Sequence, residues 1–268
     1  MSAGPLLCAV GAGVLAGVAG GLFGVGGGLV LIPFLTGYFK LTQHQAHGTS
    51  LAVIGVTAWV SLIAYAAFSN VAWWTAAIVS VASVLTARVG ARLATRTPPA
   101  RLARAFAVFL VVVALRLLWE APRGVGGGLD HGPTFHLTSL GIGLAVGLLS
   151  GYMGVGGGIV AVPAFTLLLG MSQQLAQGTS LAVIAVVAPV GAAEHSRHGN
   201  LVGRVVPGLA LGAALGGPLA SWCAQRLPQH GLARAFAVFL LANAAYMWRR
   251  AGRERGPRGE SASTAGPG

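Results

Sequence analysis

The chain has 268 residues, of which 55% are apolar and only 8% are charged. A water-soluble domain carries about 25% charged residues, so this composition excludes an ordinary soluble enzyme. Lys40 is the only formally charged side chain between Met1 and Ala87, and none occurs between His131 and Ala193. Because about 20 apolar residues suffice to cross a hydrocarbon core, the sequence predicts a multi-pass protein of the cell membrane.

The net charge of +12 comes mainly from arginines, which gather at the ends of apolar segments and in the stretch 249–258. A basic protein can bind nucleic acid, but arginines in these places are typical of topology signals and of contacts with lipid headgroups. We therefore expect the lipid bilayer as a partner and no nucleic acid. Cys8 and Cys223 lack the spacing of a metal site or a redox pair, so the sequence predicts no metal and no cofactor.

Apolar segments follow one another along the chain in two groups of five. The first group covers residues 6–23, 29–39, 47–68, 71–95 and 102–119, and the second covers residues 137–153, 159–169, 178–193, 201–225 and 232–248. The second segment of each group has about 11 residues, or about 16 Å as a helix, which is too short to cross a bilayer unaided. The pattern predicts an all-α polytopic membrane protein with a short broken or re-entrant helix in each group.

The two groups are copies of one unit. GVGGG at 24–28, GTSLAVI at 48–54 and LARAFAVFL at 102–110 each recur 130 residues later. Self-similarity at a fixed distance indicates a duplicated architecture. We expect a first transmembrane repeat over residues 1–119, a polar linker over 120–136, a second transmembrane repeat over 137–249 and a disordered basic tail over 250–268.

Arginines at segment ends indicate that the two repeats have opposite orientations. Five of them surround the turn before the fifth segment, namely Arg88, Arg92, Arg96, Arg101 and Arg104. The matching turn of the second repeat has only Arg226 and Arg234, and the tail is again rich in arginine. Because cytoplasmic loops carry an excess of Lys and Arg, the five-arginine turn and the tail are both expected in the cytoplasm. This requires an odd number of crossings per repeat, either five or three plus a re-entrant hairpin, whereas parallel repeats would leave five arginines outside.

The repeated GVGGG motif predicts a helix break at membrane depth. A helix that begins again there presents free N–H groups with a partial positive charge, and no Cβ atoms keep a ligand away. Broken helices at matching positions of two repeats point to the substrate site of a transporter. The predicted anion ligands are Gly26, Gly27, Gly28, Gly156, Gly157 and Gly158. The upstream glycines spaced by four, Gly13 to Gly21 and Gly143 to Gly151, are interpreted instead as sites of close helix packing.

A second repeated motif reads TQHQAHGTS at 42–50 and SQQLAQGTS at 172–180. Its hydroxyl, amide and imidazole groups can donate hydrogen bonds to an oxyanion. The candidate ligands are His47, Gly48, Thr49, Ser50, Gln177, Gly178, Thr179 and Ser180. Thr42 and Ser172 are predicted to cap the helices that follow.

Few side chains in the apolar segments could couple transport to protons. His44 and His47 lie in the second motif, and an imidazole changes charge near physiological pH, so these two are the candidates for proton coupling. Glu194, His195 and His198 end the eighth segment, and we interpret them as solvated groups at the edge of the membrane.

The two motifs together closely resemble the signature regions of the TauE/SafE sulfite exporter family, also called the TSUP family. The resemblance is carried by GVGGGLVLIPFL with AHGTSLAVI in the first repeat and by GVGGGIVAVPAFTLLLG with AQGTSLAVI in the second, and it extends over residues 5–248. It implies an integral membrane transporter that exports sulfite, sulfonates or related organosulfur anions across the cytoplasmic membrane. The TQHQAH stretch departs from strict two-fold symmetry, because the second repeat lacks these histidines.

Two other functions compete with a secondary transporter. GTSLA begins like the GxSxG elbow of a serine hydrolase, but Ala52 and Ala182 stand where the closing glycine belongs. The nucleophile would also need an oriented base, and the neighbouring histidines occur in one copy only, so no enzyme is expected. A passive anion channel would use the same pore. The sequence leaves open the particular anion, the coupling ion and the oligomeric state.

Overall fold

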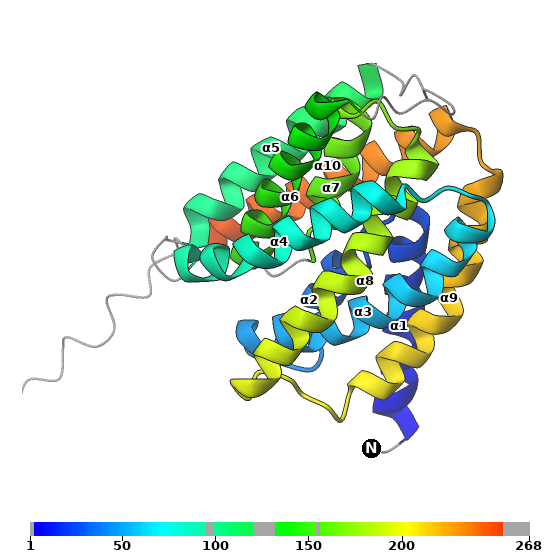
Figure 1. Ribbon diagram of the computed structural model, residues 1–268. Coiled ribbons are helices and arrows are strands. Elements are labelled where there is room, and N and C mark those ends of the chain that lie inside the picture. Colours follow the sequence, from blue (N-terminus) through cyan, green and yellow to red (C-terminus); the bar gives the residue numbers. More distant parts are fainter. Residues whose placement is uncertain (1–2, 95–98, 120–131, 154–155, 254–268) are drawn as a thin grey trace, which may run out of the picture.

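The computed structural model describes residues 3–94, 99–119, 132–153 and 156–253, and the described residues form ten helices (Figure 1). In chain order they are α1 (Ala3–Phe23), α2 (Gly28–Gly37), α3 (Gln43–Ala67), α4 (Trp73–Ala94), α5 (Pro99–Trp119), α6 (Pro133–Met153), α7 (Gly158–Leu168), α8 (Gln173–Arg197), α9 (Val206–Arg226) and α10 (Gln229–Arg253).

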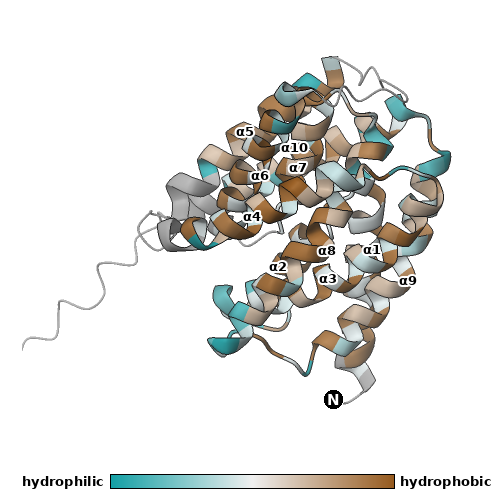
Figure 2. Cartoon of the chain, viewed as in Figure 1, coloured by the Kyte–Doolittle hydropathy of each residue, from teal (hydrophilic) through white to brown (hydrophobic). Residues whose placement is uncertain are grey.

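Helix length and composition identify the membrane-crossing elements. Seven helices, α1, α3, α4, α6, α8, α9 and α10, are long and apolar enough to cross a membrane. In contrast, α2 and α7 have only 10 and 11 residues. Large apolar side chains such as Leu15, Ile63 and Leu219 are 65–70% exposed, which is typical of faces that meet lipid, while polar residues gather at helix ends and loops (Figure 2). The prediction of an all-α multi-pass membrane protein with short apolar helices is confirmed.

Two of the long helices begin earlier than their apolar segments. α3 begins at Gln43 and α8 at Gln173, so both polar motifs lie within the first turns of these helices rather than before them. The predicted caps are confirmed, because the hydroxyls of Thr42 and Ser172 each accept a hydrogen bond from the backbone N–H three residues later, at 3.3 Å. Such caps satisfy N–H groups that the first helical turn leaves free.

Part of the predicted linker is helical. α6 begins at Pro133, inside the stretch 120–136 that we assign to the linker. Residues 120–131 of that stretch lie outside the described residues, and so do residues 254–268 of the basic tail.

Glycines bring α1 against α9 and α6 against α4. Gly13, Gly17 and Gly21 of α1 lie so close to α9 that an added Cβ atom on each would overlap a backbone carbonyl of that helix. Gly143, Gly147 and Gly151 of α6 approach the α4 backbone in the same way. The contacts advance in the same direction on both helices of each pair, so each pair is parallel. The interpretation of these glycines as packing residues is confirmed.

The centre of the molecule is formed by α3 and α8, in both of which more than half of the residues are buried. Here the contacts run in opposite directions, because Gly48 near the start of α3 faces His195 near the end of α8, whereas Tyr65 near the end of α3 faces Gly178 near the start of α8. These helices therefore cross the core antiparallel. We call the end of the core where α3 finishes the Tyr65 end, and the opposite one the His195 end.

Candidate functional site

Two glycine breaks interrupt the helices where the GVGGG motif predicts them. Gly27 and Gly157 directly precede α2 and α7, with φ angles of 81° and 76°. Only glycine adopts this left-handed backbone without steric cost. Both short helices therefore begin with main-chain N–H groups that have no partner within the helix.

The two breaks lie against each other in the interior. A Cβ atom on Gly158 would be 2.8 Å from the Cα of Val25 in the other break. Gly26 and Gly156 both face Ile54 of α3, with added Cβ atoms 2.6 and 3.4 Å from its Cγ2. All six glycines predicted as anion ligands are buried, and the structure brings the two groups of three together. Gly154 and Val155 lie outside the described residues.

The GTS motifs hold the loops that precede α4 and α9. An added Cβ atom on Gly48 would overlap the carbonyl oxygen of Asn200, and one on Gly178 would overlap that of Asn70. The hydroxyl of the adjacent threonine accepts a hydrogen bond from the backbone two residues after each asparagine. In Thr49 this bond measures 3.1 Å and in Thr179 it measures 3.0 Å. The motifs thus perform matching structural tasks at the two ends of the core.

The serines of the two motifs have different partners. Ser180 Oγ donates to the carbonyl oxygen of Gly24 at 2.8 Å and so fixes the start of the first glycine break. Ser50 Oγ donates to the carbonyl oxygen of His47 in its own helix at 2.9 Å. Both serines and both threonines are fully buried. Their hydroxyls bind backbone in this conformation, and their contact with an anion, like that of His47 and Gln177, stays a prediction.

The Tyr65 end is closed by polar contacts among three helices. The hydroxyl of Tyr65, which is fully buried, lies 3.0 Å from the carbonyl oxygen of Gly21 and 2.9 Å from Oε1 of Gln177. Nearby, in the part of the chain that the structure describes, Gln177 Nε2 and Ser61 Oγ are buried without a hydrogen-bond partner. Buried polar groups are normally paired. This closed end therefore holds polar atoms that water would satisfy if the end opened.

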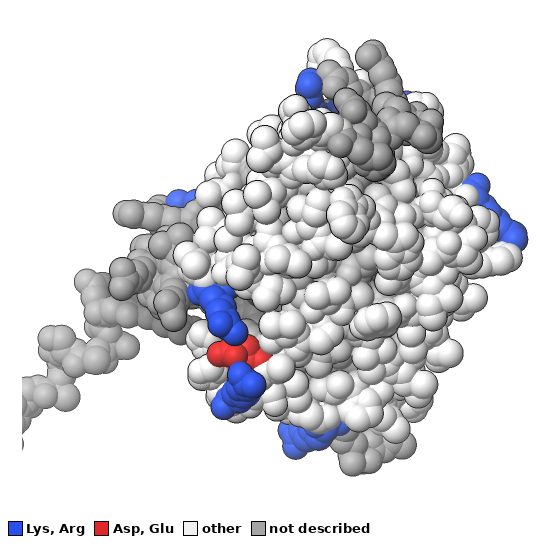
Figure 3. All heavy atoms as spheres, in the orientation of Figure 1, with Lys and Arg blue, Asp and Glu red and all other residues white. Residues whose placement is uncertain are grey.

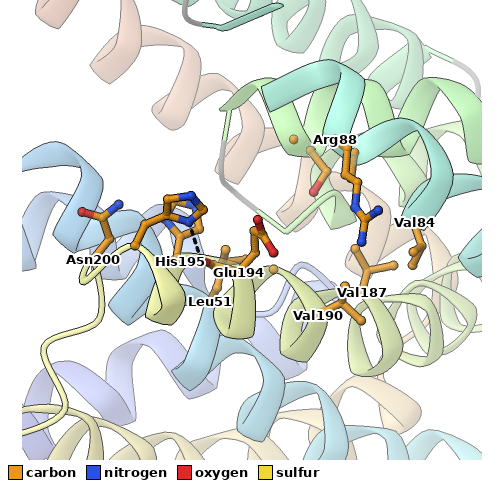
Figure 4. A pocket seen from close by; sticks show the side chains of 13 residues that line it. Leu51, Val84, Arg88, Val187, Val190, Glu194, His195 and Asn200 are labelled. Carbon is orange, nitrogen blue, oxygen red and sulfur yellow. Dashed lines mark hydrogen bonds between the residues drawn. The ribbon is translucent and has the colours of Figure 1, made fainter. Parts of the chain in front are cut away.

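A pocket of about 500 Å³ lies at the His195 end, between α3, α4, α6 and α8 (Figure 4). Its apolar wall is formed by Leu51, Val84, Ala87, Val187 and Val190, and its remaining lining residues are Arg88, Ser150, Gly151, Gly191, Glu194, His195, His198 and Asn200. An apolar cavity with a few convergent polar groups is the usual form of a small-molecule site. None of the site residues predicted from the two motifs lines it.

Opposite charges enter this pocket from two helices. Figure 4 shows Arg88 of α4 pointing into the pocket, with Glu194 and His195 of α8 on another wall. Glu194 forms an ion pair with Arg197 at 3.6 Å. It is the one acidic residue that the structure describes, so the red atoms between arginines in Figure 3 belong to it. The residues that we interpreted as solvated groups at the membrane edge thus also line a pocket.

The matching positions at the Tyr65 end, 130 residues away in sequence, are uncharged. Arg88 corresponds to Pro218, Glu194 to Ala64, His195 to Tyr65 and His198 to Phe68. The residues there are packed, since an added Cβ atom on Gly217 would be 2.7 Å from Ser61 Oγ, and Phe68 stands edge-on to Trp222 with ring centroids 5.9 Å apart. Tyr65, Ser61 and Gly217 are buried in these contacts.

The two histidines predicted for proton coupling begin α3 at the His195 end. His47 Nε2 is 2.9 Å from Gln43 Nε2 in the preceding turn, and His44 is exposed. Neither is among the described residues that line the pocket. Their coupling role stays a prediction.

Sequence reasoning did not single out Arg88. It counted this residue only as one of five topology arginines, because a charge near the end of an apolar segment is usually solvated. The available signal was its position inside the span Trp73–Gly90, since an ionisable residue within a transmembrane helix usually faces a cavity.

Comparison with known proteins adds independent information. The family model described as Sulfite exporter TauE/SafE matches residues 8–247. The chain is 30% identical over 254 residues to a "Probable membrane transporter protein" of Xylella fastidiosa (strain Temecula1), with 91% of this chain and 95% of the relative covered. It is 28% identical over 251 residues to the "Probable membrane transporter protein YunE" of Bacillus subtilis, with 85% and 92% covered. A "Probable membrane transporter protein" of Haemophilus influenzae is 27% identical over 267 residues, with 91% and 97% covered. With its two glycine breaks, two GTS motifs and full-length match, this chain belongs to the TauE/SafE sulfite exporter family of membrane transporters.

Proposed function

We propose that the protein is a secondary transporter that exports small sulfur-containing oxyanions, such as sulfite or a sulfonate, across the cytoplasmic membrane by alternating access. The observation that carries this proposal is that a pocket opens at the His195 end while the matching positions at the Tyr65 end are packed. A carrier that works by alternating access never has both faces open at once, so an open face is accompanied by a closed one. The glycine breaks lie between these two ends, where a substrate would be held.

Inverted repeats are part of this proposal. α3 and α8 are copies of one sequence segment, yet they cross the core in opposite directions. The helix pairs follow the same relation. α1 of the first repeat lies against α9 of the second, and their respective copies, α6 and α4, also lie against each other. A two-fold axis in the membrane plane relates elements in this way, and such repeats support rocking about a central site.

The described basic residues favour a cytoplasmic location for the His195 end. Lys40, Arg197 and Arg204 lie in or beside loops at this end, and Arg88 lies in the pocket itself. At the opposite end, Arg226 closes α9. Because Lys and Arg are enriched on the cytoplasmic side, the pocket opens inward in this conformation.

The path from the pocket to the breaks is short. Ser150 lines the pocket, and an added Cβ atom on Gly157 would be 3.3 Å from its Cβ. Leu51 and Val187, also in the lining, stand one helical turn from Ile54 and Ile184, which pack against the glycines. We place the transported anion at the N–H groups of the two breaks, with His47, Gln177 and the GTS hydroxyls as further donors once the helices move apart.

Transport in purified form tests the function. Proteoliposomes that contain the protein are expected to take up radiolabelled sulfite or a small sulfonate with saturable kinetics, in competition with other sulfur oxyanions. Protein-free liposomes provide the background. Folded protein that moves none of these anions would contradict the proposal, and single-channel currents without saturation would replace the carrier by a channel.

A glycine variant tests the central site. Gly156→Ala places a Cβ at a residue with φ of 80°, inside the second break, whereas Gly170→Ala creates the same backbone strain at φ of 65° in the loop before α8. We expect at least a ten-fold lower transport rate for Gly156→Ala and near-normal rates for Gly170→Ala, with size-exclusion profiles as the check on folding. Equal effects of the two variants would contradict a special role for the break.

Proton coupling by His44 and His47 has its own test. Proton movement that accompanies sulfite transport is expected to fall in the His44→Ala, His47→Ala double variant. Unchanged substrate-dependent proton flux would remove these residues from the mechanism.

A further inference from the structure

Arg88 lies near the end of the membrane span Trp73–Gly90 and is exposed. Its side chain nevertheless points into the pocket (Figure 4). Glu194 is engaged by Arg197 at 3.6 Å, while Arg88 has no ion-pair or hydrogen-bond partner among the described residues. A guanidinium is always charged and carries five N–H donors in a planar fork that matches oxyanions. An unpartnered arginine in a pocket is a ready anion ligand.

Two further polar side chains of the same pocket, His195 and Asn200, can contribute hydrogen bonds. His195 is the neighbour of Glu194 on α8, and Asn200 follows in the loop toward α9. Both offer N–H donors, and both are only partly exposed. An oxyanion in a pocket of about 500 Å³ can therefore meet a fixed positive charge on one wall and neutral donors on another.

We propose that Arg88, His195 and Asn200 form an oxyanion capture site at the cytoplasmic mouth, and that the outer face has no equivalent, so the protein binds its substrate more tightly from the cytoplasm. This inference rests on the proposed function and on the proposed orientation. At the outer face Pro218 and Tyr65 occupy the positions of Arg88 and His195. An outward-open state would thus offer hydroxyl and amide groups at these positions, while Arg226 at that end lies over the Trp222 ring, 4.2 Å from its centroid.

Glu194 competes with the substrate in this site. Its carboxylate is 53% exposed and stands in the same pocket as Arg88, where it repels an incoming anion and weakens the field of the arginine. The inference therefore predicts opposite effects for two neighbouring charges. Removing Arg88 weakens capture, whereas removing Glu194 strengthens it.

Side-resolved transport measures the asymmetry. Everted vesicles present the cytoplasmic face to radiolabelled sulfite, and right-side-out vesicles present the outer face. We expect a lower KM in everted vesicles than in right-side-out vesicles. The maximal rate in everted vesicles should be lower in the same proportion, because the ratio of maximal rate to KM must be equal in both directions for a carrier without a driving gradient. Arg88→Gln is expected to raise the KM from the cytoplasmic face about ten-fold, as for the loss of a charge-assisted hydrogen bond, and to leave the KM from the outer face unchanged.

Three further variants sharpen this test. Glu194→Gln is expected to lower the cytoplasmic KM about two- to five-fold, and Arg88→Lys to retain part of the affinity. Arg204→Gln is the matched control, because it removes a positive charge from an exposed residue at the same end that does not line the pocket. The capture site would be overturned if Arg88→Gln changed the KM equally from both faces, or if Arg88→Gln and Arg204→Gln had the same KM.

Binding measurements separate the capture site from the transport function. Calorimetry of sulfite with detergent-purified protein is expected to show weaker binding by Arg88→Gln than by the unmodified protein. Loss of transport with this difference intact would overturn the transport proposal and leave the capture site standing. If both proteins transport sulfite with equal binding and equal KM values, the capture site would be overturned and the transport proposal would stand.

Discussion

At the His195 end, Arg88 and His195 face a pocket of about 500 Å³, whereas at the Tyr65 end Pro218 and Tyr65 occupy the matching positions in a packed interface. The backbone contacts at the two ends are nevertheless the same. A GTS glycine meets an asparagine carbonyl at each end, and a GTS threonine holds the following loop. Positions that agree between the ends therefore belong to the scaffold, and positions that differ give each end its own chemistry.

The largest expected effect concerns the scaffold glycines. Gly48→Ala and Gly178→Ala each force a Cβ atom against a backbone carbonyl of a loop, and each is expected to cost about 3 kcal/mol of stability. Gly11→Ala, with nothing within 4 Å of the added Cβ, is the control and should be neutral or slightly stabilising. Thermal unfolding in detergent measures these differences. A tolerated substitution at one end only would show that the two ends are not structurally equivalent.

The second largest effect is expected for the two motif serines, whose substitutions should differ in their cost in stability. Ser180→Ala leaves the buried carbonyl of Gly24 without its hydrogen bond and is expected to cost about 1–3 kcal/mol. Ser50→Ala removes a bond to a carbonyl of the same helix, and such bonds contribute little to stability. Unfolding midpoints of the two variants compare them directly, and equal losses would contradict the different partners described above.

Tyr65→Phe tests the closure of the Tyr65 end, which the proposed orientation places outside. It removes the hydroxyl contacts with Gly21 and Gln177, which are expected to contribute about 1 kcal/mol, or about a five-fold change in the population of the open state. A reporter cysteine at Ser61, in a chain with Cys8→Ser and Cys223→Ser, should then react about five-fold faster with an impermeant thiol reagent added outside. Unchanged labelling would mean that Tyr65 does not hold this end closed.

The smallest effect is expected for Arg197. Its ion pair with Glu194 involves side chains that are 77% and 53% exposed, and exposed pairs contribute little. Arg197→Gln should therefore leave the unfolding temperature unchanged within error. A marked loss would mean that the rim of the pocket is part of the scaffold rather than of the binding surface.

Much of the architecture was predictable because the signals are local. Runs of apolar residues place all ten helices, and four glycines in five residues predict both breaks. The starts of α3 and α8 were predicted too late, because Gln43 and Gln173 are polar and an apolar pattern does not include them. Gln173 is nevertheless fully buried, which no residue-type preference indicates.

The site was less predictable, since its features depend on contacts between distant segments. Tyr65 and Gln177 meet across 112 residues, and Arg88 faces the pocket only because α4 lies beside α8. Sequence spacing along one helix carries no information about such neighbours. The chemistry of the motif residues predicts anion donors, whereas in the folded core the hydroxyls of Thr49, Thr179 and Ser180 bond to the backbone of other segments.

The pairing of α1 with α9 has a consequence for biosynthesis. α1 is made before α9, the helix that fills its glycine groove, and α2 to α8 are made in between. During that time α1 stays in the lipid with its groove unfilled, because membrane helices insert before they associate. A chain truncated before α9 would leave this groove open permanently. An unfilled glycine groove on α1 therefore distinguishes an incomplete chain from a finished one.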